Sequence, residues 1–205
     1  MKTGALILAA GQASRFGSPK QLLEWEGVTL LDRACLTALA AACDPVLRVL
    51  GDYTGKILPL SCPPGIHTLV HPDWHQGMGS SLSAGLEHLL VIEPSLEAAL
   101  ILLPDQPLIT PDLLRQYLQR SDPKKAPIIL CDHGTATGPP ALFHRDYFPE
   151  LLALRGDQGA KSVAARHPDS VLTIPFPDAA WDLDTPEAWD RFIRSRATSS
   201  EPRSP

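Results

Sequence analysis

Short runs of apolar residues alternate along this chain with longer segments in which apolar residues recur every three or four positions. The short runs have the length and composition of buried strands, and the longer ones have the period of amphipathic helices. Strands are expected at residues 5–9, 45–50, 66–70, 98–103, 128–131, 141–143 and 171–174. Because strands that alternate with helices form parallel sheets, the sequence predicts an α/β domain with a mostly parallel sheet. No internal repeat or linker divides the chain, so we expect one domain.

Four helices are predicted from their period and their start signals. The first covers Thr29–Cys43, with the Thr29 hydroxyl as its cap, and the second covers about 79–90. The third begins at Thr110 and the fourth at Thr185, and both hydroxyls precede a proline and an acid, which favour a helix start. The inward faces of these two helices are expected to consist of Leu113, Leu114, Tyr117 and Leu118, and of Trp189, Phe192 and Ile193.

The composition limits which partners the chain can have. Of its 205 residues, 44% are hydrophobic and 20% are charged, which is ordinary for a folded globular protein. The formal net charge of −5 disfavours a nucleic-acid binder, because such a protein needs a basic face. No apolar run approaches the roughly 18–20 residues of a membrane span. We therefore expect neither nucleic acid nor a membrane as a partner.

The two ends of the chain and its cysteines bear on where the protein works. The apolar run at 5–10 imitates a signal peptide but is shorter than the usual ~7–15 residues, so a buried first strand is expected instead. The cysteines form no C-x-x-C pair, which is typical of reduced thiols in a cytoplasmic protein. His71 and His75 have the spacing of a metal site on a helix, but Pro72 disfavours that helix. Residues 197–205 are small, polar and proline-ended, and they predict a disordered tail.

The segment after the first strand, Ala9–Lys20, combines two glycines with two cations. Gly11 and Gly17 are six residues apart, which matches neither G-x-G-x-x-G nor the Gly-Lys-Ser/Thr of a P-loop. Small residues nevertheless let the backbone approach a ligand closely, and successive N–H groups form a concavity that binds anions. With Arg15 and Lys20, this loop suits a triphosphate. The alternative is a plain strand–helix connection with two solvated cations.

Further candidate residues follow a predicted strand or open a predicted helix. Gly77 and Gly79 provide a turn into a helix whose positive end carries Ser80 and Ser81, either as ligand contacts or as simple caps. Asp105 ends a buried strand, where open α/β sheets bind their ligands. A carboxylate there suits Mg²⁺, which takes one or two carboxylates together with phosphate oxygens and water. The alternative is a turn residue before a proline.

Acidic side chains and glycines recur in the last third of the chain. Asp182 and Asp184 alternate in an extended segment and so point the same way. Either carboxylate suits the role of second Mg²⁺ ligand; alternatively, Asp184 caps the last helix. Gly156 and Gly159 predict a turn that allows close approach, and Asp157 and Lys161 can contact a polar heterocycle or a phosphate. A plain loop is the alternative there.

Together these segments resemble a known family. Nucleotidyltransferases that activate sugar phosphates, isoprenoid precursors and molybdopterin carry a signature similar to Leu8-Ala9-Ala10-Gly11-x-x-Ser14-Arg15-x-Gly17-x-x-Lys20. The similarity is greatest to the molybdenum cofactor cytidylyltransferase and guanylyltransferase group, whose other segments resemble residues 75–86, 103–108, 138–143, 154–161 and 182–187. The resemblance implies a single-domain, Rossmann-like three-layer sandwich with a mostly parallel sheet, the nucleotidyltransferase domain, over residues 1–196.

The resemblance also implies roles for individual residues. The implied nucleotide-binding residues are Leu8, Ala9, Ala10, Gly11, Ser14, Arg15, Lys20, Gly79, Ser80, Ser81 and Asp105. The implied catalytic residues are Arg15, Lys20 and Asp105, and the implied Mg²⁺ ligands are Asp105 and Asp184, with Asp182 in support. The implied acceptor-binding residues are Gly138, Gly156, Asp157 and Lys161. Pro139 stands where relatives often carry a polar Asn or His, which leaves the identity of the acceptor open.

The reaction that the resemblance implies is the Mg²⁺-dependent transfer of a nucleoside monophosphate, above all CMP from CTP, to the phosphate of molybdopterin cofactor, with release of pyrophosphate. GTP as the donor, or a sugar or alditol phosphate as the acceptor, is an alternative. An alternative of another class is a non-catalytic cofactor chaperone that serves a molybdoenzyme of the hydroxylase type. Because the chain retains Asp105, Asp182 and Asp184 together with Lys20, we expect an enzyme.

Overall fold

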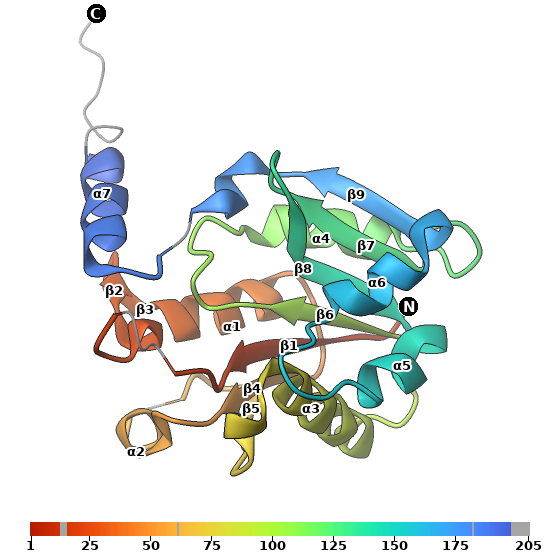
Figure 1. Ribbon diagram of the computed structural model, residues 1–205, viewed down its shortest axis with the longest axis horizontal. Coiled ribbons are helices and arrows are strands. Elements are labelled where there is room, and N and C mark those ends of the chain that lie inside the picture. Colours follow the sequence, from red (N-terminus) through yellow and green to blue (C-terminus); the bar gives the residue numbers. More distant parts are fainter. Residues whose placement is uncertain (13–15, 61, 182, 198–205) are drawn as a thin grey trace, which may run out of the picture.

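A seven-stranded, mostly parallel sheet forms the centre of the molecule (Figure 1). The computed structural model describes residues 1–12, 16–60, 62–181 and 183–197. The strands of this sheet are β1 Thr3–Ala9, β4 Val46–Leu50, β5 Ile66–Val70, β6 Ala98–Leu102, β7 Ile128–Asp132, β8 Thr137–His144 and β9 Val171–Pro175. They lie in the order β5-β4-β1-β6-β8-β7-β9, in which β8 runs against both of its neighbours and the other pairs are parallel. The predicted fold class is confirmed.

Helices cover both faces of this sheet (Figure 1). The core on one face receives side chains from α1 Leu30–Ala40, α2 Thr54–Ile57 and α4 Pro111–Arg120. The core on the other face receives them from α3 Met78–Ile92, α5 Phe148–Leu152 and α6 Lys161–Arg166. A last helix, α7 Pro186–Ala197, stands beside the sheet with a hairpin of β2 Glu24–Trp25 and β3 Val28–Thr29. Single 3₁₀ turns are η1 Lys20–Leu22, η2 Trp74–Gln76, η3 Arg145–Tyr147, η4 Pro168–Ser170 and η5 Pro177–Ala180.

Strand β1 shows how the sequence builds the two core layers. Its successive side chains point to opposite faces, so Ala5, Ile7 and Ala9 enter the core beneath α1 and α4. Leu6 and Leu8 enter the core beneath α3 and α5. A strand that is covered on both sides has no face for water, which explains why its sequence is apolar without alternation. The result is the three-layer sandwich that was expected.

Helix α7 packs on the β2–β3 hairpin rather than on the sheet. Phe192 of this helix is fully buried, and its ring centroid lies 5.1 Å from that of Trp25, 5.5 Å from that of Trp181 and 5.7 Å from that of Trp189. Leu183 is buried in the same cluster. This aromatic cluster therefore fixes the segment before α7 next to the β2–β3 hairpin. The hairpin follows the segment Ala9–Lys20, which we call the glycine loop.

The predicted strands and helices are all present, with ends that differ by a few residues. The predicted caps are also confirmed: the side chains of Thr29 and Thr110 accept hydrogen bonds from the N–H groups of Asp32 and Leu113. The predicted end of the first helix at Cys43 is wrong, because α1 ends at Ala40.

The early end of α1 has a local cause. Ala42 adopts a φ of +68°. The N–H of Cys43 donates to the carbonyl of Ala38 over 3.1 Å, and the N–H of Ala42 donates to the carbonyl of Leu39 over 2.9 Å. These two bonds form a Schellman motif, which ends a helix in the left-handed conformation. Glycine usually occupies the position of Ala42, so the sequence carried no signal for this boundary.

Four short elements were not predicted: α2, which lies in the stretch 52–65, the β2–β3 hairpin, α5 and α6. Each spans too few residues to show a hydrophobic period. His71 follows β5 and His75 lies in η2, so they do not share a helix, as Pro72 predicted. All four cysteines are free thiols. Helix α7 includes Ala197, and the rest of the expected tail lies outside the described residues. None of the helices in the described ranges is long and apolar enough to cross a membrane.

Candidate active site

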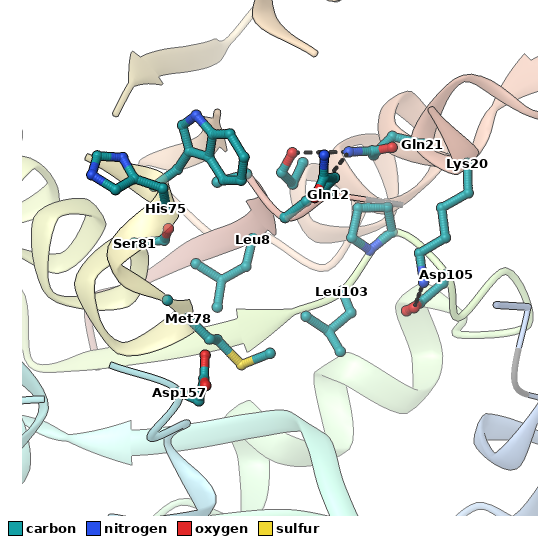
Figure 2. A pocket seen from close by; sticks show the side chains of 16 residues that line it. Leu8, Gln12, Lys20, Gln21, His75, Met78, Ser81, Leu103, Asp105 and Asp157 are labelled. Carbon is teal, nitrogen blue, oxygen red and sulfur yellow. Dashed lines mark hydrogen bonds and ion pairs between the residues drawn. The ribbon is translucent and has the colours of Figure 1, made fainter. Parts of the chain in front are cut away.

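A cavity of about 410 Å³ lies at the carboxyl ends of the neighbouring parallel strands β1 and β6 (Figure 2). Open α/β sheets bind their ligands at this edge. The lining residues that the sequence had suggested are Leu8, Ala9, Ala10, Gly11, Lys20, Ser81, Asp105 and Asp157. Gly77, expected as part of the turn into a helix, also lines the cavity, and the lining residues to which the sequence had assigned no role are Gln12, Gln21, Trp74, His75, Met78, Leu103 and Pro104. Segments that are far apart in the sequence thus meet around one cavity.

Lys20 joins two carboxylates at one end of this cavity. Its Nζ lies 2.7 Å from Oδ2 of Asp105 and 2.5 Å from Oδ1 of Asp184. Burial alone would lower the pKa of Lys20, but the two carboxylates outweigh burial and raise that pKa above its ordinary value. The ammonium therefore stays protonated between two acids that lie far apart in the chain.

The backbone explains how Asp184 reaches this position. Leu183, its neighbour, is fully buried in the aromatic cluster around Phe192. The cap of α7 is Thr185, whose hydroxyl accepts a hydrogen bond of 3.2 Å from the N–H of Ala188. The alternative that Asp184 itself caps the helix is thus not what the structure shows, and its carboxylate faces Lys20 instead.

Gln21 supports the glycine loop from beneath. Its side chain is only 4% exposed, and its amide nitrogen donates to the carbonyl of Ala9 over 3.1 Å and to that of Gly11 over 3.5 Å. These bonds tie η1 to the end of β1, so that the segment with Lys20 folds back toward the cavity. Residues 13–15 lie outside the described ranges, so the roles expected for Ser14 and Arg15 remain predictions.

The start of α3 is held by a close contact between two glycine turns. Gly77 has a φ of +102°, and a Cβ on it would lie 2.4 Å from the carbonyl carbon and oxygen of Gly156. The N–H of Gly79 donates to that same carbonyl oxygen over 2.8 Å. Gly156 therefore contacts both Gly77 and Gly79 without lining the cavity itself. This contact brings the next residue, Asp157, to the cavity wall.

Replacing Gly77 with Ala is expected to lower the free energy of unfolding by about 1–3 kcal/mol, because the backbone conformation and the contact with Gly156 both exclude a side chain. Urea unfolding measures this loss. Gly55→Ala is the matched control, since Gly55 lies in α2 and a Cβ there meets nothing within 4 Å. Equal stability of the two variants would contradict the proposed tight contact.

The two serines at the start of α3 occupy different surroundings. Ser81 is 4% exposed and lines the cavity. The hydroxyl oxygen of Ser80 lies 2.7 Å from Nε2 of His71, and burial lowers the pKa of that imidazole. Burial therefore favours the neutral imidazole, and its contact with Ser80 holds that hydroxyl beside the end of β5. Among the described residues, Ser80 and Gly79 do not belong to the cavity wall.

The residues expected to bind the acceptor are divided between two spaces. Gly138 and Lys161 line a smaller cavity of about 130 Å³, which shares Leu8, Met78 and Leu103 with the larger one. Asp157 belongs to the larger cavity. The two spaces are thus neighbours, separated by residues that line both.

Asp105 and Asp184 fit a divalent cation, because each offers an oxygen to one and the same cationic atom, Nζ of Lys20. Mg²⁺ completes a site of one or two carboxylates with phosphate oxygens and water. Within the described part of the chain, no group of three or more His, Cys, Asp or Glu side chains could hold a metal ion. The two carboxylates would therefore need a ligand's oxygens to hold such an ion firmly. Asp182 lies outside the described residues.

A comparison with known protein families identifies the class to which this protein belongs. Residues 5–171 match the model of a family described as the MobA-like NTP transferase domain. The chain belongs to this family, and it is an enzyme of the nucleotidyltransferase class.

Three relatives match over most of their length. The purine catabolism protein PucB of Bacillus subtilis is 28% identical over 202 residues, which cover 93% of this chain and 95% of PucB. A protein of Nostoc named as a probable molybdenum cofactor guanylyltransferase is 28% identical and covers 89% of this chain and 86% of its own. The molybdenum cofactor cytidylyltransferase of Escherichia coli is 25% identical and covers 96% of each chain. The family relation thus extends to enzymes named for molybdenum cofactor synthesis.

A similar solved structure contains a metal ion. The crystal structure of Rv0371c from Mycobacterium tuberculosis in complex with manganese has a TM-score of 0.77 and 27% sequence identity. The match covers 95% of this chain and 100% of that one. Manganese therefore accompanies this fold in a similar structure.

Proposed function

We propose that this protein transfers a nucleoside monophosphate, with CTP as the favoured donor, to the phosphate of a molybdopterin-type cofactor. The observation that carries the proposal is the cluster of Lys20, Asp105 and Asp184 at the edge of the 410 Å³ cavity. The names of the cytidylyltransferase and guanylyltransferase relatives support the class of acceptor.

The charges at the cavity suit a triphosphate that binds together with a divalent ion, because the carboxylates there outnumber Lys20. Lys20 and the N–H groups of the loop after β1 bind the phosphates, and Arg15 adds a second cation. Asp105 and Asp184 hold Mg²⁺, which supplies Lewis-acid stabilisation of the phosphate charge when it is bound. Neither carboxylate needs to accept a proton in this scheme.

The transfer is a single displacement. An oxygen of the acceptor phosphate forms a bond to the α-phosphorus, the bond from that phosphorus to the α–β bridging oxygen breaks, and pyrophosphate leaves. An ionised phosphate is already a nucleophile, so no covalent enzyme intermediate is required. The chain's own residues position the two substrates and stabilise the charge that develops on the leaving group.

The smaller cavity bears on the acceptor. Apart from Lys161, its wall consists of apolar residues and glycines, among them Leu103, Leu130, Pro139 and Ala141. A polyol placed there would lose hydrogen bonds to water without regaining them from the protein. The apolar wall therefore favours an acceptor with a flat ring and few hydroxyl groups over a sugar or alditol phosphate. The four free thiols support a cytoplasmic enzyme.

The donor and the acceptor are tested together by incubating the protein with each of the four NTPs, Mg²⁺ and molybdopterin cofactor released from a molybdoenzyme, and measuring pyrophosphate. Release is expected with the cofactor and to be fastest with CTP, and it is expected to vanish when a phosphatase has removed the cofactor's phosphate. Fastest release with GTP would instead support the second candidate, a guanylyltransferase, which the Nostoc relative favours. No release with any NTP would contradict the proposal.

A further inference from the structure

The larger cavity has a charged end and an aromatic end. Figure 2 shows Lys20 and Asp105 on one side of the cavity and His75 on the other, with Leu8 between them. Trp74 also lines the cavity, and its ring centroid lies 6.3 Å from that of His75. A nucleoside triphosphate has the same division, since it carries its charge at one end and a flat base with apolar faces at the other.

Trp74 is fixed at its place by Gly51, the residue that follows β4. A Cβ on Gly51 would lie 2.6 Å from Cγ and 2.7 Å from Cβ of Trp74, and 2.4 Å from the carbonyl oxygen of Ala10. The first atoms of the indole side chain thus rest directly on the backbone of Gly51. Trp74 is partly buried and packs against the core beneath α3. The ring is therefore a fixed part of the cavity wall rather than a mobile surface side chain.

The other three tryptophans have a different position. Their rings pack around Phe192 of α7 and stabilise the attachment of that helix; they are Trp25, Trp181 and Trp189. In the described part of the chain, Trp74 is the tryptophan that lines the cavity.

We propose that Trp74 is the residue on which the base of the donor nucleotide stacks. This inference rests on the proposed function, in which the cluster around Lys20 takes the phosphates. With the phosphates at that end, the base extends toward Trp74 and His75. Stacking on an aromatic ring does not depend on which base is bound, because every base has a π-face. Trp74 therefore contributes affinity for the nucleoside part, and the choice between CTP and GTP rests on other groups.

The test compares ligands with and without a base. Isothermal calorimetry in the presence of Mg²⁺ measures the affinity of CTP, GTP and pyrophosphate for the wild type and for Trp74→Ala, Trp74→Leu and Trp74→Phe. The Ala and Leu variants are expected to bind both nucleotides about 5- to 150-fold more weakly, as the loss of one stacking contact implies. Binding of pyrophosphate is expected to change less than about twofold, since it has no base. The Phe variant keeps a ring and is expected to retain most of the nucleotide affinity.

The controls separate stacking from folding. Val91→Ala shortens an exposed apolar side chain of α3 that does not line the cavity, and it is expected to leave all three affinities unchanged. The Leu variant keeps apolar volume at position 74, so it tests the ring even if the Ala variant unfolds. Equal losses of affinity for nucleotides and pyrophosphate, or no loss for either, would overturn the role of Trp74. Neither result would overturn the proposed function. A wild-type protein that binds no nucleotide would overturn the proposed function, and this inference with it.

Discussion

Asp105→Asn is expected to lower the rate of pyrophosphate release by about 10²–10³-fold, the usual effect of removing one group that stabilises a transition state. Asparagine has the shape of aspartate but lacks its charge, so it keeps a hydrogen-bond acceptor for Lys20 and holds a divalent ion poorly. Asp184 still partners the ammonium, so the variant is expected to fold. Initial rates at saturating CTP and cofactor measure the effect.

The control for this variant is Asp112→Asn. Asp112 is an exposed acid at the start of α4 that pairs with Arg115 and does not belong to the cavity. The Asp112→Asn variant lacks the same amount of negative charge as Asp105→Asn, and its turnover is expected to match that of the wild type. Near-normal turnover of Asp105→Asn would refute the assignment of Asp105 as a metal ligand.

Lys20→Met is expected to change two properties in opposite directions. Turnover falls by about 10²–10³-fold, because the cation that binds the phosphates is lost. The affinity of the nucleotide-free protein for Mn²⁺ rises by about tenfold, because Nζ no longer occupies the oxygens of Asp105 and Asp184. Electron paramagnetic resonance of free Mn²⁺ measures this affinity.

The thermal stability of Lys20→Met is expected to depend on whether a metal ion is present. Without the ammonium, two carboxylates converge with no charge between them, which destabilises the folded state. The melting temperature of Lys20→Met is therefore expected to fall in EDTA and to recover when Mn²⁺ is added. Lys125→Met removes an exposed lysine and is expected to alter neither property. If Lys20→Met leaves the Mn²⁺ affinity unchanged, the ammonium of Lys20 and the metal ion do not compete for the same carboxylates.

The sequence carried much of the fold because its signals are local. Continuous apolar runs predict strands that are covered on both faces, as β1 and β6 are. Hydroxyl caps predict helix starts, and Thr29 and Thr110 act as such caps. Where the signal was absent, the prediction was wrong: Ala42 ends α1 in a conformation that glycine usually adopts.

The candidate site was predictable only where a motif carries it. The segments that contain Lys20, Asp105 and Asp184 resembled family motifs, and the structure brings these three side chains together. Gln21 and Trp74 were missed because their positions depend on contacts between segments that are distant in the chain. Trp74 packs on Gly51, and no hydrophobic period or motif spacing in the sequence predicts that contact.

The most direct test of a common site for the triphosphate and the divalent ion is the affinity of the protein for Mn²⁺ with and without CTP. Since two carboxylates and a competing ammonium hold a free ion poorly, CTP is expected to tighten Mn²⁺ binding in the wild type, and Asp105→Asn is expected to abolish that gain. Mn²⁺ binding that is independent of CTP, or a gain that persists in Asp105→Asn, would contradict a common site.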